Sequence, residues 1–172
     1  GWILKLPVSI FVRLTGGTDG IYLAFRYLYV LLHLCGSTLL FLLLRKRTGI
    51  GAIAASFFYF LYVPFCISAP SYNSMGIEFL TLSVAILVCC SSPWSAVISG
   101  CFLALAVLCC PYLAILFFIY GAAVFLFRHH TQRLSFLEGK KFAFFSLGIV
   151  VPACCFLMDV LLHIRLSQWS QI

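Results

Sequence analysis

The sequence has few charged residues and very few acidic ones. Only 9 % of its 172 residues are charged and four are acidic, whereas 64 % are hydrophobic. Soluble domains have about 45–50 % apolar and about 25 % charged residues, and one small core cannot bury this much apolar surface. The composition therefore excludes an ordinary soluble domain, and also a disordered chain, which requires low hydrophobicity. It indicates a multi-pass membrane protein.

The sequence also lacks the short motifs of several enzyme classes. It contains no GxxxxGKS/T phosphate loop, no HExxH zinc motif, no GxSxG nucleophile motif and no CxxC pair. The nine cysteines lie almost entirely within apolar runs, where free cysteine acts as a small hydrophobic residue. No metal site and no cofactor are evident from these residues.

A natural start is missing as well. Residue 1 is glycine, and the only methionines are Met75 and Met158. We therefore expect the chain to be a piece of a longer protein. Within it, residues 1–172 are expected to form a single membrane domain.

Short polar or Gly/Pro-marked breaks divide the apolar sequence into runs, and a transmembrane helix needs roughly 20 apolar residues. The stretch 96–127 would form a helix of about 48 Å, which is too long for a hydrocarbon core of ~30 Å. Pro111 is expected to break it, because proline removes a backbone donor. The sequence thus predicts an all-α integral membrane fold with about six transmembrane helices, near 21–44, 52–69, 75–90, 96–110, 111–127 and 142–162.

The lysines and arginines give this arrangement an orientation. With six spans, seven of the eleven basic residues lie on one side: Arg45, Lys46, Arg47, Arg128, Arg133, Lys140 and Lys141. The positive-inside rule makes that side cytoplasmic. If 96–127 crossed only once, residues 128–141 would change sides and the bias would reverse. The excess of 11 − 4 = +7 charges therefore marks a membrane face, and the expected partner is the lipid bilayer and not nucleic acid.

Residues 1–16 have a different pattern from the spans. Lys5, Ser9 and Arg13 recur every four residues and form one narrow polar stripe on an otherwise apolar helix. The segment is short for a span, so we expect an amphipathic helix that lies in the interface on the extracytoplasmic side.

Four ionisable side chains in or near the predicted spans are candidate substrate-binding residues. Charged groups inside a membrane are costly, so they mark functional sites by default. In the predicted orientation all four lie toward the extracytoplasmic side, where they can pair and line a polar cavity. The alternative is structural, either pairing that only neutralises charge or snorkelling to the interface. The four residues are Arg26, Glu78, Asp159 and His163.

Two neighbours of Arg26 carry polar groups as well. Arg26, Tyr29 and His33 are spaced by three and four residues, so they share one helical face. We interpret Tyr29 and His33 as residues that hydrogen-bond to a neighbouring helix. A ligand role is the alternative.

The short loop at 70–74 is a further candidate site. Asn73 is the only asparagine, and it is not a glycosylation sequon because Met75 occupies the Ser/Thr position. Tyr72 and Asn73 are candidates for contacts to a ligand, because loops often carry binding residues. The alternative is that Asn73 or Ser74 only caps the following helix.

The order of these features resembles a known family. The surface helix runs into LTGGTDGIYLAFRYL, and the next span runs into LLLRKRTGIGAIAASFFYFLYVPF. Then come the loop and helix SAPSYNSMGIEFLTLSVAIL and a small-residue helix broken at proline, SGCFLALAVLCCPYLAILFFIYG. Over residues 1–127 this order is similar to the membrane region of bacterial family-39-like glycosyltransferases, which belong to the GT-C superfamily.

The resemblance implies a transferase of the bacterial cytoplasmic membrane. Such enzymes transfer a sugar from a polyprenyl-phosphate donor to an acceptor at the extracytoplasmic face. The family's catalytic carboxylate lies between a first span and the surface helix. We therefore expect the carboxylate and that first span to be missing from this chain, and its catalytic residues are unknown. Arg26 matches an arginine that family members often carry after that helix. Tyr72-Asn73-Ser74 replaces an Arg-Pro-Asp-like stretch, which argues against an acid role for this loop.

Two other functions compete with the transferase. The proline-broken helix and the intramembrane charges are also typical of transporters and flippases. The short loops and the absence of motifs are equally compatible with a non-catalytic membrane protein.

Overall fold

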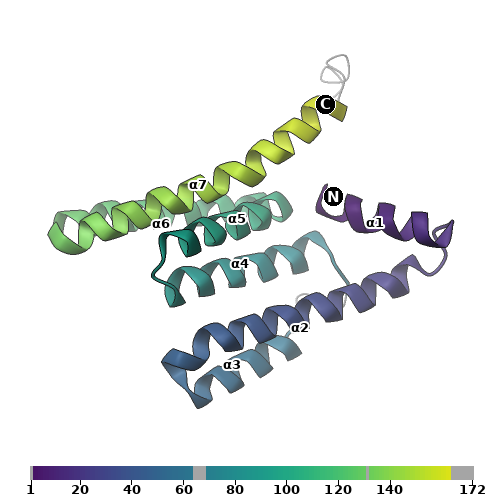
Figure 1. The fold of residues 1–172 in the computed structure, drawn as a ribbon, viewed down its shortest axis with the longest axis horizontal. Coiled ribbons are helices and arrows are strands. Elements are labelled where there is room, and N and C mark those ends of the chain that lie inside the picture. Colours follow the sequence, from purple (N-terminus) through teal and green to yellow (C-terminus); the bar gives the residue numbers. More distant parts are fainter. Residues whose placement is uncertain (1, 64–68, 131, 164–172) are drawn as a thin grey trace.

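The computed structural model describes residues 2–63, 69–130 and 132–163, and gives side chains there except at 2–3, 6, 127–138 and 163. Over these ranges the chain forms helices and no strands (Figure 1), which confirms the predicted all-α fold. The helices are α1 (Trp2–Thr15), α2 (Ile21–Thr48), α3 (Ile50–Leu61), α4 (Tyr72–Cys89), α5 (Pro93–Cys109), the 3₁₀ turn η2 (Pro111–Ala114), α6 (Ile115–His130) and α7 (Gln132–His163).

Three of these segments are long and apolar enough to cross a membrane by themselves. They are α2, α4 and the part of α7 from Gly139 to Leu162. Helix α3, helix α5 and the segment Pro111–Leu126 are apolar but shorter. By length and composition the described chain has three candidate membrane spans, as expected of a membrane protein, and the other predicted crossings fall on shorter helices.

Several helices begin or end at residues other than those predicted for the spans. The predicted span 52–69 overlaps α3, which begins at Ile50 and ends at Leu61. Pro64 explains the early end, because a proline disfavours helix at the residue before it. The predicted span 142–162 is the apolar part of α7, which begins ten residues earlier, at Gln132. Between Cys109 and Ile115 the helix is interrupted by η2, and Pro111 lies at that break.

The helices pack side by side with alternating directions (Figure 1). Contacts join α2 to α4, α4 to α5 and α5 to α7, while α3 packs on α2 and α6 packs on α7. The connections after α2, α4 and α6 lie at one end of the bundle, at the left of Figure 1. Helix α1, the starts of α2 and α4, and the connection between α5 and α6 lie at the other end.

Two glycines allow the closest approach of helices in the bundle, where α5 crosses α7. A Cβ on Gly100 would overlap the carbonyl oxygen of Phe145, and a Cβ on Gly148 would overlap the carbonyl oxygen of Val97. The Cys101 thiol donates to the Gly148 carbonyl at 3.1 Å. Small residues let helices approach closely in membranes, where van der Waals packing drives association. This crossing therefore fixes α7 on the rest of the bundle.

Serine pairs hold two other helix contacts. Ser83 on α4 and Ser99 on α5 each donate a hydroxyl hydrogen bond to the other's carbonyl, at 2.8 and 2.7 Å. Ser37 on α2 donates to the Ser56 carbonyl on α3 at 2.7 Å. All four side chains are buried. Hydrogen bonds between helices stabilise membrane bundles by about 0.6 to 2 kcal/mol each.

Two basic residues from different helices bind the C-terminal end of α4. Arg47 donates to the Cys89 carbonyl at 3.4 Å, and Lys141 donates to the Leu87 carbonyl at 2.6 Å. The last carbonyls of a helix lack partners within it and carry partial negative charge. Arg47 and Lys141, far apart in the sequence, therefore lie at the same end of the bundle.

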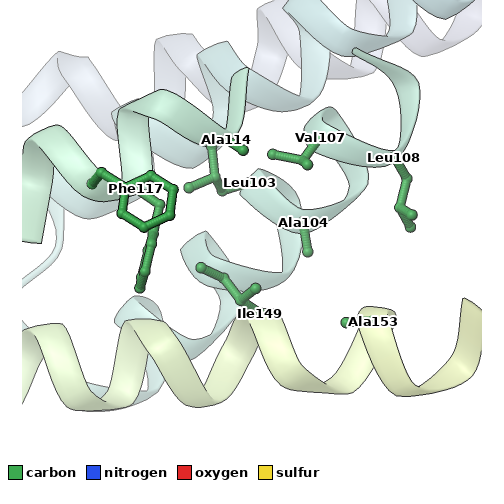
Figure 2. A pocket seen from close by; sticks show the side chains of 9 residues that line it. Leu103, Ala104, Val107, Leu108, Ala114, Phe117, Ile149 and Ala153 are labelled. Carbon is green, nitrogen blue, oxygen red and sulfur yellow. The ribbon is translucent and has the colours of Figure 1, made fainter. Parts of the chain in front are cut away.

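A groove without polar groups lies between α5, α6 and α7 (Figure 2). Its volume is about 200 Å³, and its lining includes Leu103, Val107, Phe117 and Ile149. All nine lining side chains are apolar. The groove offers hydrocarbon contact but no group that can recognise a polar ligand.

Candidate functional site

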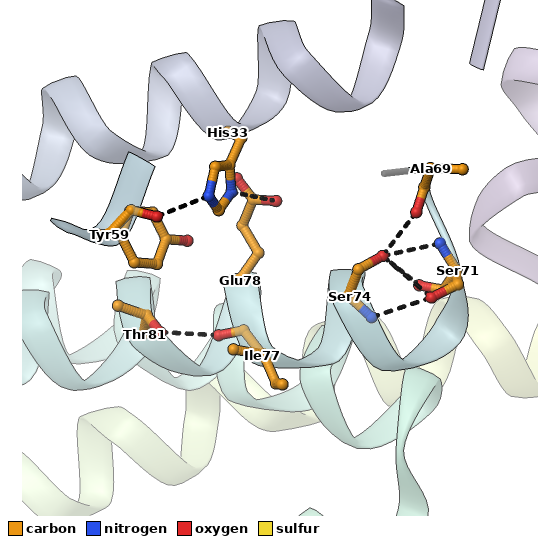
Figure 3. Close-up of polar contacts among 8 residues, drawn as sticks. All are labelled: His33, Tyr59, Ala69, Ser71, Ser74, Ile77, Glu78 and Thr81. Atoms are coloured by element: carbon orange, nitrogen blue, oxygen red, sulfur yellow. Dashed lines mark hydrogen bonds and ion pairs between the residues drawn. The ribbon is translucent and has the colours of Figure 1, made fainter. Parts of the chain in front are cut away.

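A cluster of polar aromatic and charged side chains lies where α2, α3 and α4 meet. His33 from α2, Tyr59 from α3 and Glu78 from α4 point toward one another (Figure 3), and Tyr29 lies one turn before His33. We call these four residues the His33–Glu78 cluster. His33 and Glu78 are only 4 % and 5 % exposed. An ionisable pair buried within apolar helices is the strongest candidate site in the described chain.

The tautomer of His33 follows from its partners. Its Nε2 lies 2.7 Å from the Tyr59 carbonyl oxygen, which can only accept, so Nε2 carries the proton. Nδ1 then faces Glu78 Oε2 at 3.8 Å, which is longer than a hydrogen bond. With a neutral imidazole and an ionised carboxyl, two acceptors face each other. An additional donor has to satisfy them: a proton, a water molecule or a ligand group.

Glycine and stacked rings shape this cluster. The His33 ring stacks between those of Tyr29 and Tyr59, with centroid distances of 5.3 and 4.7 Å. A Cβ on Gly36 would lie 2.8 Å from Glu78 Oε1 and 3.5 Å from the Tyr59 hydroxyl. Glycine at position 36 therefore leaves the space that the Glu78 carboxyl occupies.

Several buried polar atoms of this region have no hydrogen-bond partner in the described chain. They are the hydroxyls of Tyr29, Ser56 and Tyr59, together with His33 Nδ1 and Glu78 Oε2. Buried polar groups are nearly always satisfied, so a concentration of unsatisfied ones needs an explanation. Water or a ligand is the explanation that fits a polar centre of this kind.

The start of α4 forms a second polar region, at the end of the bundle that carries α1. Ser71 is the N-cap: its hydroxyl accepts from the Ser74 amide at 3.1 Å, and the Ser74 hydroxyl accepts from the Ser71 amide at 2.9 Å (Figure 3). This capping box stabilises the helix start. Of the two capping residues considered from the sequence, Ser74 takes part, whereas Asn73 does not cap the helix.

Tyr72 and Asn73 lie beside the Pro111 turn. The Cys110 thiol is 3.3 Å from the Tyr72 carbonyl oxygen and 3.8 Å from Asn73 Oδ1. The Tyr72 side chain is exposed and Asn73 is half-buried. Tyr72 and Asn73, predicted from the sequence to lie in a loop, belong to the first turn of α4, because the helix begins directly after its cap at Ser71. The fold brings this turn and the proline break together, although they are far apart in the sequence.

The ionisable candidates that the structure describes have different surroundings. Glu78 faces His33, whereas Asp159 forms an ion pair with Lys5 of α1 at 3.4 Å. Arg26 is exposed, and none of the hydrogen bonds or ion pairs between described side chains joins it to Glu78 or Asp159. The side chain of His163 lies outside the described residues. Sequence spacing gives the faces of single helices but not how they rotate toward one another, which decides the partners.

Only one of the residues that contact His33 or Glu78 could be anticipated from sequence spacing. His33 shares a helical face with Arg26 and Tyr29, and its interpretation as a residue that bonds to a neighbouring helix agrees with its contact to the Tyr59 carbonyl. Tyr59 has no pattern that marks it. Within the described part of the chain, no three His, Cys, Asp or Glu side chains gather as metal ligands would.

Comparisons with known proteins give no relative. No family model matches the chain, and neither the curated proteins nor the solved structures contain a significant match.

Proposed function

We propose that this chain is the membrane region of a GT-C-type glycosyltransferase in the bacterial cytoplasmic membrane. It transfers a sugar from a polyprenyl-phosphate donor to an acceptor at the extracytoplasmic face. The family resemblance motivates the proposal. The observation that carries the proposal is the position of the amphipathic helix α1, which lies at the end of the bundle opposite Arg47 and Lys141. Under the positive-inside rule the end with the basic residues is cytoplasmic, so α1 lies on the extracytoplasmic side.

The proposal includes six membrane crossings, by α2, α3, α4, α5, α6 and α7. Their alternating directions support it (Figure 1), as do the apolar compositions of the three shorter segments. A helix that is too short to span the bilayer alone is accommodated by local thinning of the bilayer or by flanking residues that snorkel. Six crossings place both basic stretches of the sequence, 45–47 and 128–141, on the cytoplasmic side.

Arg26 is the proposed contact to the donor phosphate. It lies on α2 one turn after the helix start, exposed, and near the proposed extracytoplasmic end. Arginine binds phosphate with two parallel, charge-assisted hydrogen bonds. The remaining candidates at this end are Tyr72, Asn73, Asp159 and His163, for the sugar or the acceptor. No residue of this chain is assigned a catalytic role.

Replacement of Arg26 by alanine tests this assignment. Loss of a charge-assisted phosphate contact is expected to lower sugar transfer about ten- to a hundredfold. The measurement is release of labelled sugar from its polyprenyl-phosphate carrier in membranes that contain the complete protein. Arg45→Ala, at the opposite end, serves as the matched control and should keep its activity. Unchanged transfer by Arg26→Ala at normal expression would refute the assignment.

A transporter or flippase is the second candidate, because of the buried His33–Glu78 pair. Ionisable groups of this kind mark ion or proton pathways in membrane proteins. The same membranes separate the two functions. Release of sugar to an acceptor indicates a transferase, whereas movement of an intact lipid-linked sugar across the bilayer without release indicates a flippase.

A further inference from the structure

A second groove lies between α2, α4 and α5, and it differs from the groove of Figure 2 in one respect. Its volume is about 170 Å³, and most of its lining is hydrocarbon, including Leu39, Phe79 and Phe102. Glu78 is the single charged residue among its nine lining residues. Gly36 also lines the groove, and the Glu78 carboxyl lies against it. The groove is thus apolar except for one buried carboxyl.

The polar surroundings of that carboxyl are rich in acceptors. His33 Nε2–H is committed to the Tyr59 carbonyl, so a neutral His33 presents only the lone pair of Nδ1 toward Glu78. Glu78 Oε2 and His33 Nδ1 lack hydrogen-bond partners among the described residues, and so do the nearby phenol groups of Tyr29 and Tyr59, which can donate as well as accept. No lysine or arginine forms an ion pair with Glu78 in the described structure. A carboxylate in such a setting is costly unless a cation or a proton neutralises it.

We infer that this groove binds a lipophilic amine, with its hydrocarbon chain along α2, α4 and α5 and its ammonium group beside Glu78. An ammonium group supplies the positive charge and three donors, which match the unpartnered acceptors. A phosphate or other anion is excluded by charge, because it would face a carboxylate at low dielectric.

The inference does not depend on the proposed transferase activity. The donor phosphate of that reaction is assigned to the exposed Arg26, whereas the groove disfavours phosphate. Amine binding is measured without any sugar substrate. Failure of one proposal therefore leaves the other standing.

Three photoreactive probes with the same alkyl chain and different head groups test the inference. The probes carry an ammonium, a hydroxyl or a phosphate group, and the wild-type chain is held in phosphatidylcholine nanodiscs. Mass spectrometry locates the crosslinks. The ammonium probe is expected to label residues 32–39 and 75–82 at least about tenfold more than the other two, since one charge-assisted contact is worth about that factor. Equal labelling by the hydroxyl probe would overturn the inference, because a proton on Glu78 would then explain the site.

Glu78→Gln is the matching variant, because glutamine keeps the shape of the side chain and removes its charge. It is expected to lower labelling by the ammonium probe to the level of the hydroxyl probe. Asp19→Asn removes an exposed carboxylate from the α1–α2 connection and should leave labelling unchanged. Undiminished ammonium labelling of Glu78→Gln would contradict the assignment. The comparison of head groups on the wild type needs no variant, so it decides the question even if Glu78→Gln folds poorly.

Discussion

Replacement of Gly148 by alanine is expected to lower the free energy of unfolding by about 3 kcal/mol, at the upper end for overpacked positions. The added Cβ would overlap the Val97 carbonyl oxygen. Because that atom belongs to the backbone of α5, no side-chain rotation relieves the clash and the two helices have to separate. The same argument holds for Gly100→Ala against the Phe145 carbonyl. Unfolding of the purified chain in detergent, followed by circular dichroism, measures the effect.

Gly139→Ala is the matched control for this prediction. Gly139 lies in the same helix, and a Cβ there would have no neighbour within 4 Å. Alanine favours helix over glycine by about 0.5–1 kcal/mol, so this variant is expected to be slightly more stable than the wild type. If Gly148→Ala were as stable as Gly139→Ala, the close crossing of α5 and α7 would be wrong.

His33→Leu and Glu78→Met are each expected to destabilise the bundle by about 3 kcal/mol, whereas the double variant should lie within about 1 kcal/mol of the wild type. Each single change leaves one buried polar group in hydrocarbon, without the group that it faces and without the proton, water or ligand donor that the two share. The double change replaces the pair by hydrocarbon of similar size in an apolar setting. A double-mutant cycle on unfolding free energies measures this coupling.

Thr38→Val and Thr81→Val provide the control cycle. Each hydroxyl donates to a carbonyl of its own helix, Leu34 and Ile77 respectively. Their effects are expected to be small and to add within about 0.5 kcal/mol. Additive effects of His33→Leu and Glu78→Met would contradict the facing arrangement of α2 and α4.

The positions of the helices could be predicted from the sequence because they depend on local properties. Apolar runs, glycines and prolines mark the ends, and the break at Pro111 needs only the loss of a backbone donor. The early end of α3 at Leu61 depends on Pro64, which lies inside an apolar run and is easily missed. The start of α7 at Gln132 was missed because polar residues can continue a helix beyond the membrane.

The partners of the buried groups could not be predicted in this way. The face of α2 that carries Arg26, Tyr29 and His33 is evident from spacing. Which neighbour it meets depends on the rotation of α3 and α4, and on Gly36, which admits the Glu78 carboxyl. The Tyr59 carbonyl lies near the end of α3, where it accepts from the Tyr62 amide at 3.1 Å and also bonds to His33 Nε2 at 2.7 Å. These are long-range features that no local pattern encodes.

The native lysines test the membrane arrangement most directly, because they need no substitution. A membrane-impermeant amine reagent is applied to sealed vesicles of each orientation, and the labelled lysines are identified by mass spectrometry. Six crossings predict that Lys46 and Lys140 react from one face and Lys5 reacts only from the other. If Lys140 reacted together with Lys5, residues 93–130 would cross once. Labelling of Lys5 and Lys46 from the same face would contradict a spanning α2 and the account as a whole.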